Sequence, residues 1–303
     1  MTPTNFPNGI SSFGVPVLGG AILTTGSIFF VDSNTGNDGN SGKTPRTALA
    51  TIDAAIGLCT ANKGDYVICM PGHSETLTGA GAITADIAGV TVLGLGSGSV
   101  RPTLTLSTTA TTILVSAANV TFRNLRTTTS ADELVKVFNI QASHCVLDAV
   151  DFFETSTKQA ISFLLTNSSA TDLTVMNCVH RQMTAPAANG KWIELVAADR
   201  AKILNNTFHL TTTSNSASNV IGGTTTESLN VLIQGNTIVH LGGTAVVAIS
   251  LLTNTTGFVR QNYTYSSKTA IAGTHALASC GCSENYASNT ANAQGILEPV
   301  ADS

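Results

Sequence analysis

A short pattern recurs along the C-terminal two thirds of the chain and constrains its fold more than any other feature of the sequence. Alternating apolar residues lead into an anchor position, usually an asparagine, and further apolar residues follow. Successive anchors are 25, 28, 29, 30 and 26 residues apart. The anchors are Asn124, Ala149, Asn177, Asn206, Asn236 and Asn262, with weaker matches at Gly94 and Asn285. A repeat of this length predicts a solenoid in which each unit is one coil.

A second set of apolar runs keeps the same period between the anchors, for example at 136–140, 160–165 and 245–249. Gly, Asn, Ser and Thr separate the runs, so each coil turns by bends rather than by helices. We therefore predict an all-β fold, a right-handed parallel β-helix whose coils stack about 4.8 Å apart. The anchor asparagines are expected at turns, in left-handed backbone conformation, with their amides hydrogen-bonded along the stack.

The segment 47–59 is predicted to be a short helix that covers the N-terminal end of the solenoid. Leu49, Ile52, Ala55 and Ile56 share one face at helical spacing, and Pro45 stands just before the segment. An open coil exposes apolar interior and unpaired backbone, so a solenoid requires such a cover.

Composition argues against several classes of protein. Hydrophobic residues make up 43% and charged residues 11% of the 303 residues, which fits exposed β faces better than a disordered chain or a helical bundle. A net charge of -4 without a basic stripe predicts no nucleic-acid partner. Neither a membrane span nor a secretory signal is visible. Cys145 and Cys178 are interpreted as small buried residues, in keeping with a reducing compartment.

The first part of the predicted solenoid resembles a known family. A strand near Phe29 leads into a loop rich in Asp, Asn and Gly; the helix follows, and then a strand that ends in Pro71-Gly72. This order over residues 28–75 resembles the start of pectin-lyase-like β-helix domains. Such domains are frequent in bacteriophage tailspikes, head decoration proteins and polysaccharide-degrading enzymes. The resemblance implies one parallel β-helix over 28–303, with a C-terminal tail from about 290.

Residues 1–27 are interpreted as an extended N-terminal arm. The arm resembles the N-terminal arms of phage virion proteins, and it is too apolar to stay free in water. We expect it to anchor the protein to a major capsid protein, by strand addition or by filling a groove. The residues expected to make that contact are Phe6, Ile10, Phe13, Val15, Val17 and Leu18.

One acidic cluster is the best candidate for a catalytic site: Asp148, Asp151 and Glu154, with Asp172 one coil later. Polysaccharide hydrolases need paired carboxylates, and lyases need a calcium-binding carboxylate cluster with an Arg or Lys base. On a straight strand Asp148 and Asp151 point to opposite faces, so we interpret the cluster as solvated outer charges. Aromatic residues are few, and Trp192 is expected to be buried or at an interface. No catalytic residue is predicted.

Three histidines follow successive anchors at similar distances: His180 and His209 by three residues, and His240 by four. A ladder on one outer face would place them one strand apart, and a subunit axis could then gather them around a metal ion. The alternative is a row of stacked polar residues on an exposed or interface strand. We adopt that alternative and predict no metal ion or other cofactor.

Together these features favour a non-catalytic bacteriophage virion protein, a capsid decoration or cement protein. It would be made in the host cytoplasm, bind the outer capsid surface through its arm and stabilise the shell. The resemblance also implies a homotrimer, in which the weakly charged outer faces would pack around a threefold axis. The alternative is a tail-associated spike or adhesin that binds or cleaves host surface polysaccharide, because fold alone does not decide function.

Overall fold

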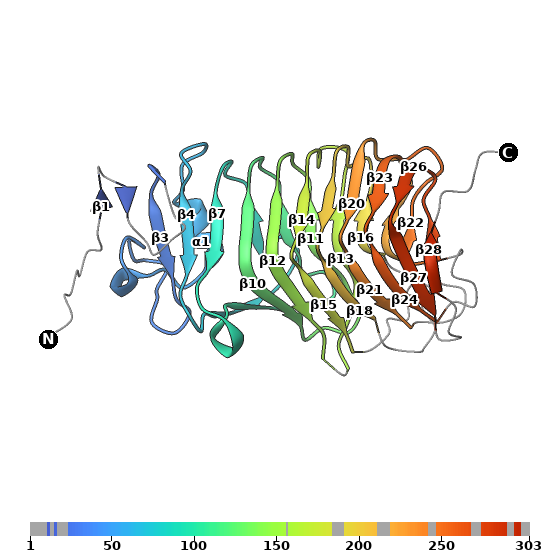
Figure 1. Ribbon diagram of the computed structural model, residues 1–303. Helices are drawn as coiled ribbons and strands as arrows, with labels where there is room; N and C mark the ends of the chain where they lie inside the picture. Colours follow the sequence, from blue (N-terminus) through green and yellow to red (C-terminus); the bar gives the residue numbers. More distant parts are fainter. Residues whose placement is uncertain are drawn as a thin grey trace, which may run out of the picture.

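The computed structural model describes residues 11–12, 15–16, 24–155, 157–183, 191–210, 219–241, 247–267, 274–289 and 294–297. Over these residues the chain is a right-handed parallel β-helix, so the fold class predicted from the repeat is confirmed. Figure 1 shows the coils stacked along one axis, with the first coils at one end and the last at the other.

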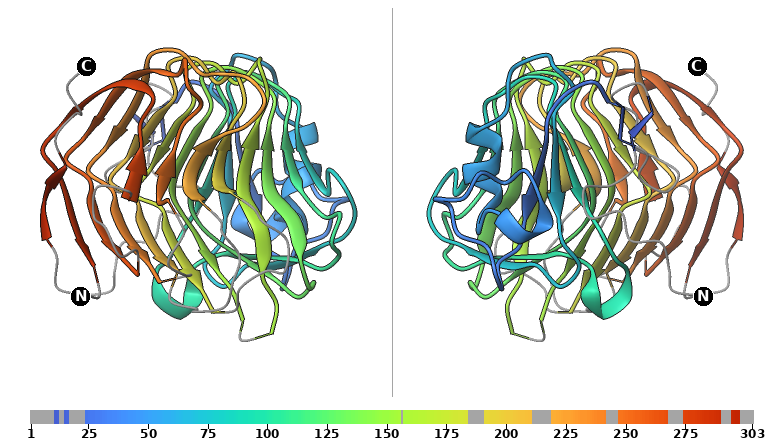
Figure 2. Two further views of the ribbon diagram at one scale, coloured as in Figure 1. Left: turned by 90° about the vertical axis from the view of Figure 1, so that its right-hand side faces the viewer. Right: turned by 90° about the vertical axis from the view of Figure 1, so that its left-hand side faces the viewer.

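Three parallel sheets run along the solenoid, and the end-on views of Figure 2 show them around one interior. The first sheet contains β3 (Ile28–Val31), β4 (Tyr66–Cys69), β7 (Thr91–Gly94), β10 (Thr121–Thr129), β12 (Val146–Phe153), β14 (Thr174–Met176), β17 (Lys202–Leu204), β20 (Val231–Gln234), β23 (Thr256–Arg260) and β26 (Ser279–Ser283). β10 and β12 continue through the corner at which the first sheet meets the second, so their second halves belong to the second sheet.

The second sheet also contains β5 (Ser74–Leu77), β8 (Thr103–Leu106), β15 (Val179–Gln182), β18 (Thr207–Leu210), β21 (Thr237–His240), β24 (Tyr263–Ser266) and β27 (Asn285–Asn289). An antiparallel strand, β28 (Gln294–Leu297), pairs with β27. The third sheet contains β6 (Ile83–Ala85), β9 (Ile113–Val115), β11 (Leu134–Ile140), β13 (Ala160–Thr166), β16 (Lys191–Leu195), β19 (Asn219–Gly223), β22 (Ile249–Ser250) and β25 (His275–Ala276).

Side chains point alternately inward and outward along each strand, so every second residue fills the interior. In the first sheet Val92, Phe122 and Leu147 point inward in register, while the threonines beside them stay outside. β-Branched Thr and Val favour this pleated conformation. Trp192 is fully buried, stacked on Phe163 with ring centroids 6.2 Å apart, in agreement with the expectation of a buried tryptophan.

The helix that covers the N-terminal end is shorter than predicted. Instead of spanning 47–59, α1 covers Ile52–Gly57 and follows a separate 3-10 turn, η1 (Pro45–Thr47). The Asp38 carboxylate accepts hydrogen bonds from the backbone N–H groups of Ala50 and Thr51, which holds these residues extended before the helix begins. The four apolar residues that predicted the helix are all buried, so it does cover the core.

The anchors occupy two neighbouring positions of the coil, not one. Asn124, Ala149 and Asn177 have positive φ angles and form the corner between the first and second sheets. Asn206, Asn236 and Asn262 lie one residue beyond that corner and point inside; the corner positions of their coils are Asn205, Gly235 and Gln261. The expected left-handed conformation therefore holds only for Asn124 and Asn177. The interior asparagines form the hydrogen-bonded ladder, which extends to Asn285.

Among the described residues, no helix is long and apolar enough to cross a membrane. β1 (Ser11–Ser12) and β2 (Val15–Pro16) form a small antiparallel pair. The other residues of 1–23 lie outside the described part of the chain.

Candidate functional site

The acidic cluster predicted on β12 is divided by the corner. Because Ala149 has a φ of 52°, the strand turns between Asp148 and Asp151, and both carboxylates lie on the outer side, Asp148 on the first sheet and Asp151 on the second. Glu154 instead points inside, where its oxygens accept the N–H groups of Ala160 and Met183. The prediction that Asp148 and Asp151 point to opposite faces is therefore wrong.

The cluster is also not solvated, contrary to the sequence-based interpretation. Asp148, Asp151 and Glu154 are only 6–7% exposed. Asp148 forms an ion pair with Arg123, with Nε of Arg123 3.1 Å from Oδ2, and its Oδ1 accepts a hydrogen bond of 2.8 Å from Asn177. These partners come from the coils before and after β12, so the fold rather than the local sequence brings them together.

Asp151 has a different environment. It forms an ion pair with Arg101, which also donates to the carbonyl of Ala149. The N–H of Val179 donates to Oδ1 of Asp151 at 3.2 Å. Burial raises the pKa of Asp151, and the positive charge of Arg101 opposes that shift. Arg101 thus ties the loop that contains η2 (Gly98–Val100) to the corner, and Figure 1 shows η2 projecting from the solenoid there.

A groove of about 640 Å³ lies on the outer side of the first sheet beside this corner. Its residues come from β4, β7, β10 and β12, including the corner residues within β10 and β12, and from the corner that follows β14. The lining residues are Tyr66, Thr91, Leu93, Thr121, Arg123, Asn124, Asp148, Ala149 and Asn177. The groove therefore crosses five successive coils, and Asp148 is the only acidic residue in its lining.

The groove is preorganised by contacts between coils. Asn124 donates through Nδ2 to the carbonyls of Gly94 and Gly96, at 2.8 and 3.0 Å. Both oxygens of Asp148 already have one partner each, and a carboxylate oxygen can accept a second. The Arg123 side chain is 53% exposed, so its remaining donors face solvent. The site can bind a ligand that offers several hydroxyl groups along a line.

The predicted histidine row does not exist. His180 points inside in register with Phe208, whereas His209 is exposed and pairs with Arg181. His240 also points inside, but it is in register with Leu210, the next inward residue after Phe208. The cause is that the later anchors lie one residue beyond the corner. Counted from the corner residue of its own coil, each histidine lies at a different distance: three, four and five residues for His180, His209 and His240. Adjacent strand residues face opposite sides, so no ladder forms.

His180 is instead part of the core. It packs on Trp192 and lies 3.6 Å from the carboxylate of Glu154. Burial lowers the pKa of His180 well below its usual range, and His209 adds to the shift. In the described part of the chain, no group of three His, Cys, Asp or Glu side chains is placed to hold a metal ion.

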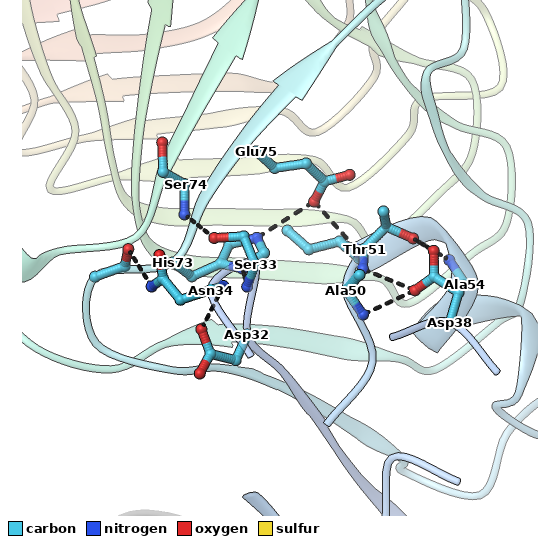
Figure 3. A network of polar contacts seen from close by, with 12 residues as sticks. Asp32, Ser33, Asn34, Asp38, Ala50, Thr51, Ala54, His73, Ser74 and Glu75 are labelled. Carbon is cyan, nitrogen blue, oxygen red and sulfur yellow. Dashed lines mark hydrogen bonds and ion pairs between the residues drawn. The ribbon is translucent and has the colours of Figure 1, made fainter. Parts of the chain in front are cut away.

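A polar network missed in the sequence joins the first coil to the cap (Figure 3). The N–H of Ser33 donates to Nδ1 of His73 at 3.0 Å, so the proton of this imidazole lies on Nε2, 3.3 Å from Glu75. Glu75 in turn accepts from the N–H of Ile52 at the start of α1. The network holds the first coil against the cap, and it explains the histidine that follows the Pro-Gly turn.

The residues proposed for capsid contact are outside what the structure can test. Phe6, Ile10, Phe13, Val17 and Leu18 lie outside the described residues, and for Val15 only the backbone in β2 is described.

No family model and no curated protein matches the sequence. Among solved structures, the chain is similar to a rhamnogalacturonan lyase with 12% identity over 91% of this chain and 90% of that chain, at a TM-score of 0.47. It is also similar to the GH136 lacto-N-biosidase from Eubacterium ramulus, with 10% identity over 86% of this chain and 68% of that chain, at a TM-score of 0.40.

These comparisons contradict the expectation of a non-catalytic protein, because the similar structures are named as enzymes. We therefore withdraw that expectation. The fold is a right-handed parallel β-helix. At these identities and TM-scores the likeness assigns no activity, and the function of this chain has to be argued from its own residues. Nothing in the comparisons points to a bacteriophage.

Proposed function

We propose that the protein binds a polysaccharide chain in the groove beside the corner of the first sheet. The observation that carries this proposal is the row of hydrogen-bonding side chains that the groove presents on successive coils, with Tyr66 at one end and Asn177 at the other. Polysaccharide binding was only the alternative prediction from the sequence, because aromatic residues are few and the acidic cluster was interpreted as solvated outer charges.

The shape of the groove fits a linear ligand. Five successive coils span four steps of about 4.8 Å, or about 19 Å along the solenoid axis. Thr91 and Thr121 form part of the floor with small polar side chains, which leaves room above the sheet. A chain of sugar rings can therefore lie along the axis, with each coil facing a different part of the polymer.

The chemistry of the groove fits hydroxyl groups. The Asp148 carboxylate accepts from hydroxyls, while Arg123 and Asn177 donate to hydroxyl or ring oxygens. Tyr66 supplies an apolar ring against which the C–H face of a sugar can pack. Because Arg123 and Asn177 already hold Asp148, little side-chain entropy is lost on binding.

The test is a binding screen of the purified protein against an array of plant, bacterial and animal polysaccharides, with product analysis to detect cleavage. Arg123→Ala should weaken binding by about tenfold, since a charge-assisted hydrogen bond contributes about 1.5 kcal/mol. Arg260→Ala is the matched control, because Arg260 occupies the same outward column on β23, away from the groove. Equal binding by the wild type and Arg123→Ala would refute the groove.

A second proposal concerns the N-terminal arm, and its apolar sequence is the observation that supports it. We propose that residues 1–27 attach the protein to the outer shell of a virus particle, through a major capsid protein, as part of a homotrimer. Deleting residues 1–27 should leave a folded body that no longer sediments with capsid shells. Unchanged co-sedimentation of the truncated protein would refute this attachment.

A further inference from the structure

Two arginines and a histidine lie on the outer side of the second sheet, across the corner from the groove. Arg126 lies on β10, Arg181 on β15 and His209 on β18. Phe153, Arg181 and His209 are in register on three successive coils, so their side chains follow one line along the solenoid axis. Arg181 and His209 are exposed.

Phe153 is a platform for both arginines. The guanidinium carbons of Arg126 and Arg181 lie 5.1 and 5.4 Å from the centroid of its ring, a distance at which cation–π attraction orients a guanidinium group. Nη2 of Arg126 also donates to the carbonyl of Gly98 at 3.1 Å. The Nε of Arg126 is buried without a hydrogen-bond partner in the described structure. The two guanidinium groups are thus positioned, but their donors are not all used.

The carboxylates near this cluster are engaged elsewhere. Asp151 neighbours Arg126 in register and interacts with its charge, but its ion-pair partner is Arg101. Glu154 points inside the solenoid. Within the described residues neither Arg126 nor Arg181 forms an ion pair with a carboxylate. Arg181 therefore has no carboxylate partner in the described part of the chain, and Arg126 shares Asp151 with Arg101.

We propose that Arg126 and Arg181, on the Phe153 platform, bind an oxyanion, and that this oxyanion is a sulfate or carboxylate group carried by the glycan. The ligand of the protein is then an acidic polysaccharide. This inference rests on the proposed function, since the cluster and the groove flank the same corner. A planar guanidinium suits bidentate contact with either group, and His209 adds a hydrogen bond at the next coil.

The experiment compares three polymers at one ionic strength: dextran sulfate, polygalacturonate and neutral dextran. Binding is measured for the wild type, for Arg126→Gln/Arg181→Gln, which removes the charge but keeps a polar side chain, and for the control Arg260→Gln. We expect the wild type to bind at least one charged polymer. The double variant should lose about tenfold or more of that affinity, and Arg260→Gln should lose little.

The result also distinguishes a sulfate ligand from a carboxylate ligand, and it tests this inference separately from the groove proposal. A loss confined to dextran sulfate identifies a sulfate ligand, and a loss confined to polygalacturonate identifies a carboxylate. Equal losses in the double variant and in Arg260→Gln would show non-specific attraction and overturn the inference, as would full binding by the double variant. If only the groove proposal is wrong, Arg123→Ala binds polysaccharide as the wild type does, and Arg126→Gln/Arg181→Gln still binds the charged polymers more weakly than the wild type.

Discussion

Asn236 is joined to Asn262 of the next coil through a single oxygen. Its Nδ2 donates to Oδ1 of Asn262 at 2.9 Å, and its backbone N–H donates to the same atom at 3.0 Å. Both side chains are fully buried, and the same double contact joins Asn206 to Asn236 and Asn262 to Asn285. The ladder satisfies the polar backbone where the solenoid turns, which an apolar core cannot do.

Asn236→Ala should destabilise the protein by about 3 kcal/mol. The change removes the acceptor of the buried Asn206 backbone N–H, one of the two acceptors of Asn206 Nδ2, and a donor to the carbonyl of Ile203. Urea denaturation followed by circular dichroism measures the loss. Asn254→Ala is the control, because Asn254 is exposed and its effect should stay within about 0.5 kcal/mol. Similar losses for the two variants would contradict the role of the ladder.

Gly257→Ala should destabilise the protein by about 3 kcal/mol. Gly257 has a φ of 134°, and a methyl group there would collide with the backbone of Val231 on the neighbouring strand. Gly57→Ala is a matched control at the end of α1, where a methyl group meets open space, and it should stabilise by about 0.5–1 kcal/mol. The prediction fails if thermal denaturation ranks the two variants in the opposite order.

Stability should decrease as the pH falls from about 6.5 towards 4, in part because of His275. Burial lowers the pKa of His275 to about 4, so the unfolded chain binds a proton at a pH where the folded chain does not. The stability is fully present above the unfolded pKa, and each pH unit below it costs about 1.4 kcal/mol. Between pH 7.5 and 5.0 the wild type should lose about 2 kcal/mol more than His275→Gln. Parallel losses in urea titrations would contradict this assignment.

One thiol should react in the folded protein. Cys282 is the only cysteine of the six that is not buried. Burial raises the pKa of Cys59 and Cys178 to about 12, which suppresses their thiolates. Titration with Ellman's reagent at pH 8 should therefore show one reactive thiol in the native protein and six after unfolding. Cys282→Ser should abolish the native reaction, and any fast-reacting thiol in that variant would contradict the burial of the other five.

The fold could be predicted because it depends on repetition, which a single sequence displays. The corner could not, because Ala149 adopts a left-handed conformation that its residue type does not announce. The acids were misassigned because the strand was treated as straight although it turns at Ala149. The false histidine row has another cause: the anchors Asn206 and Asn236 lie one residue beyond the corner, and a shift of one residue reverses the face of a side chain. Ion pairs such as Arg101 with Asp151 join residues 50 positions apart. Such contacts depend on how the coils stack, so local sequence gives no sign of them.

The most direct test of the account is a crystal structure of the protein with an oligosaccharide prepared from the polysaccharide that binds best in the array. The account predicts sugar rings in the groove above Thr91 and Thr121, with hydrogen bonds to Arg123 and Asp148 and a ring packed against Tyr66. An oligosaccharide bound on the outer side of the third sheet, with the groove empty, would contradict it.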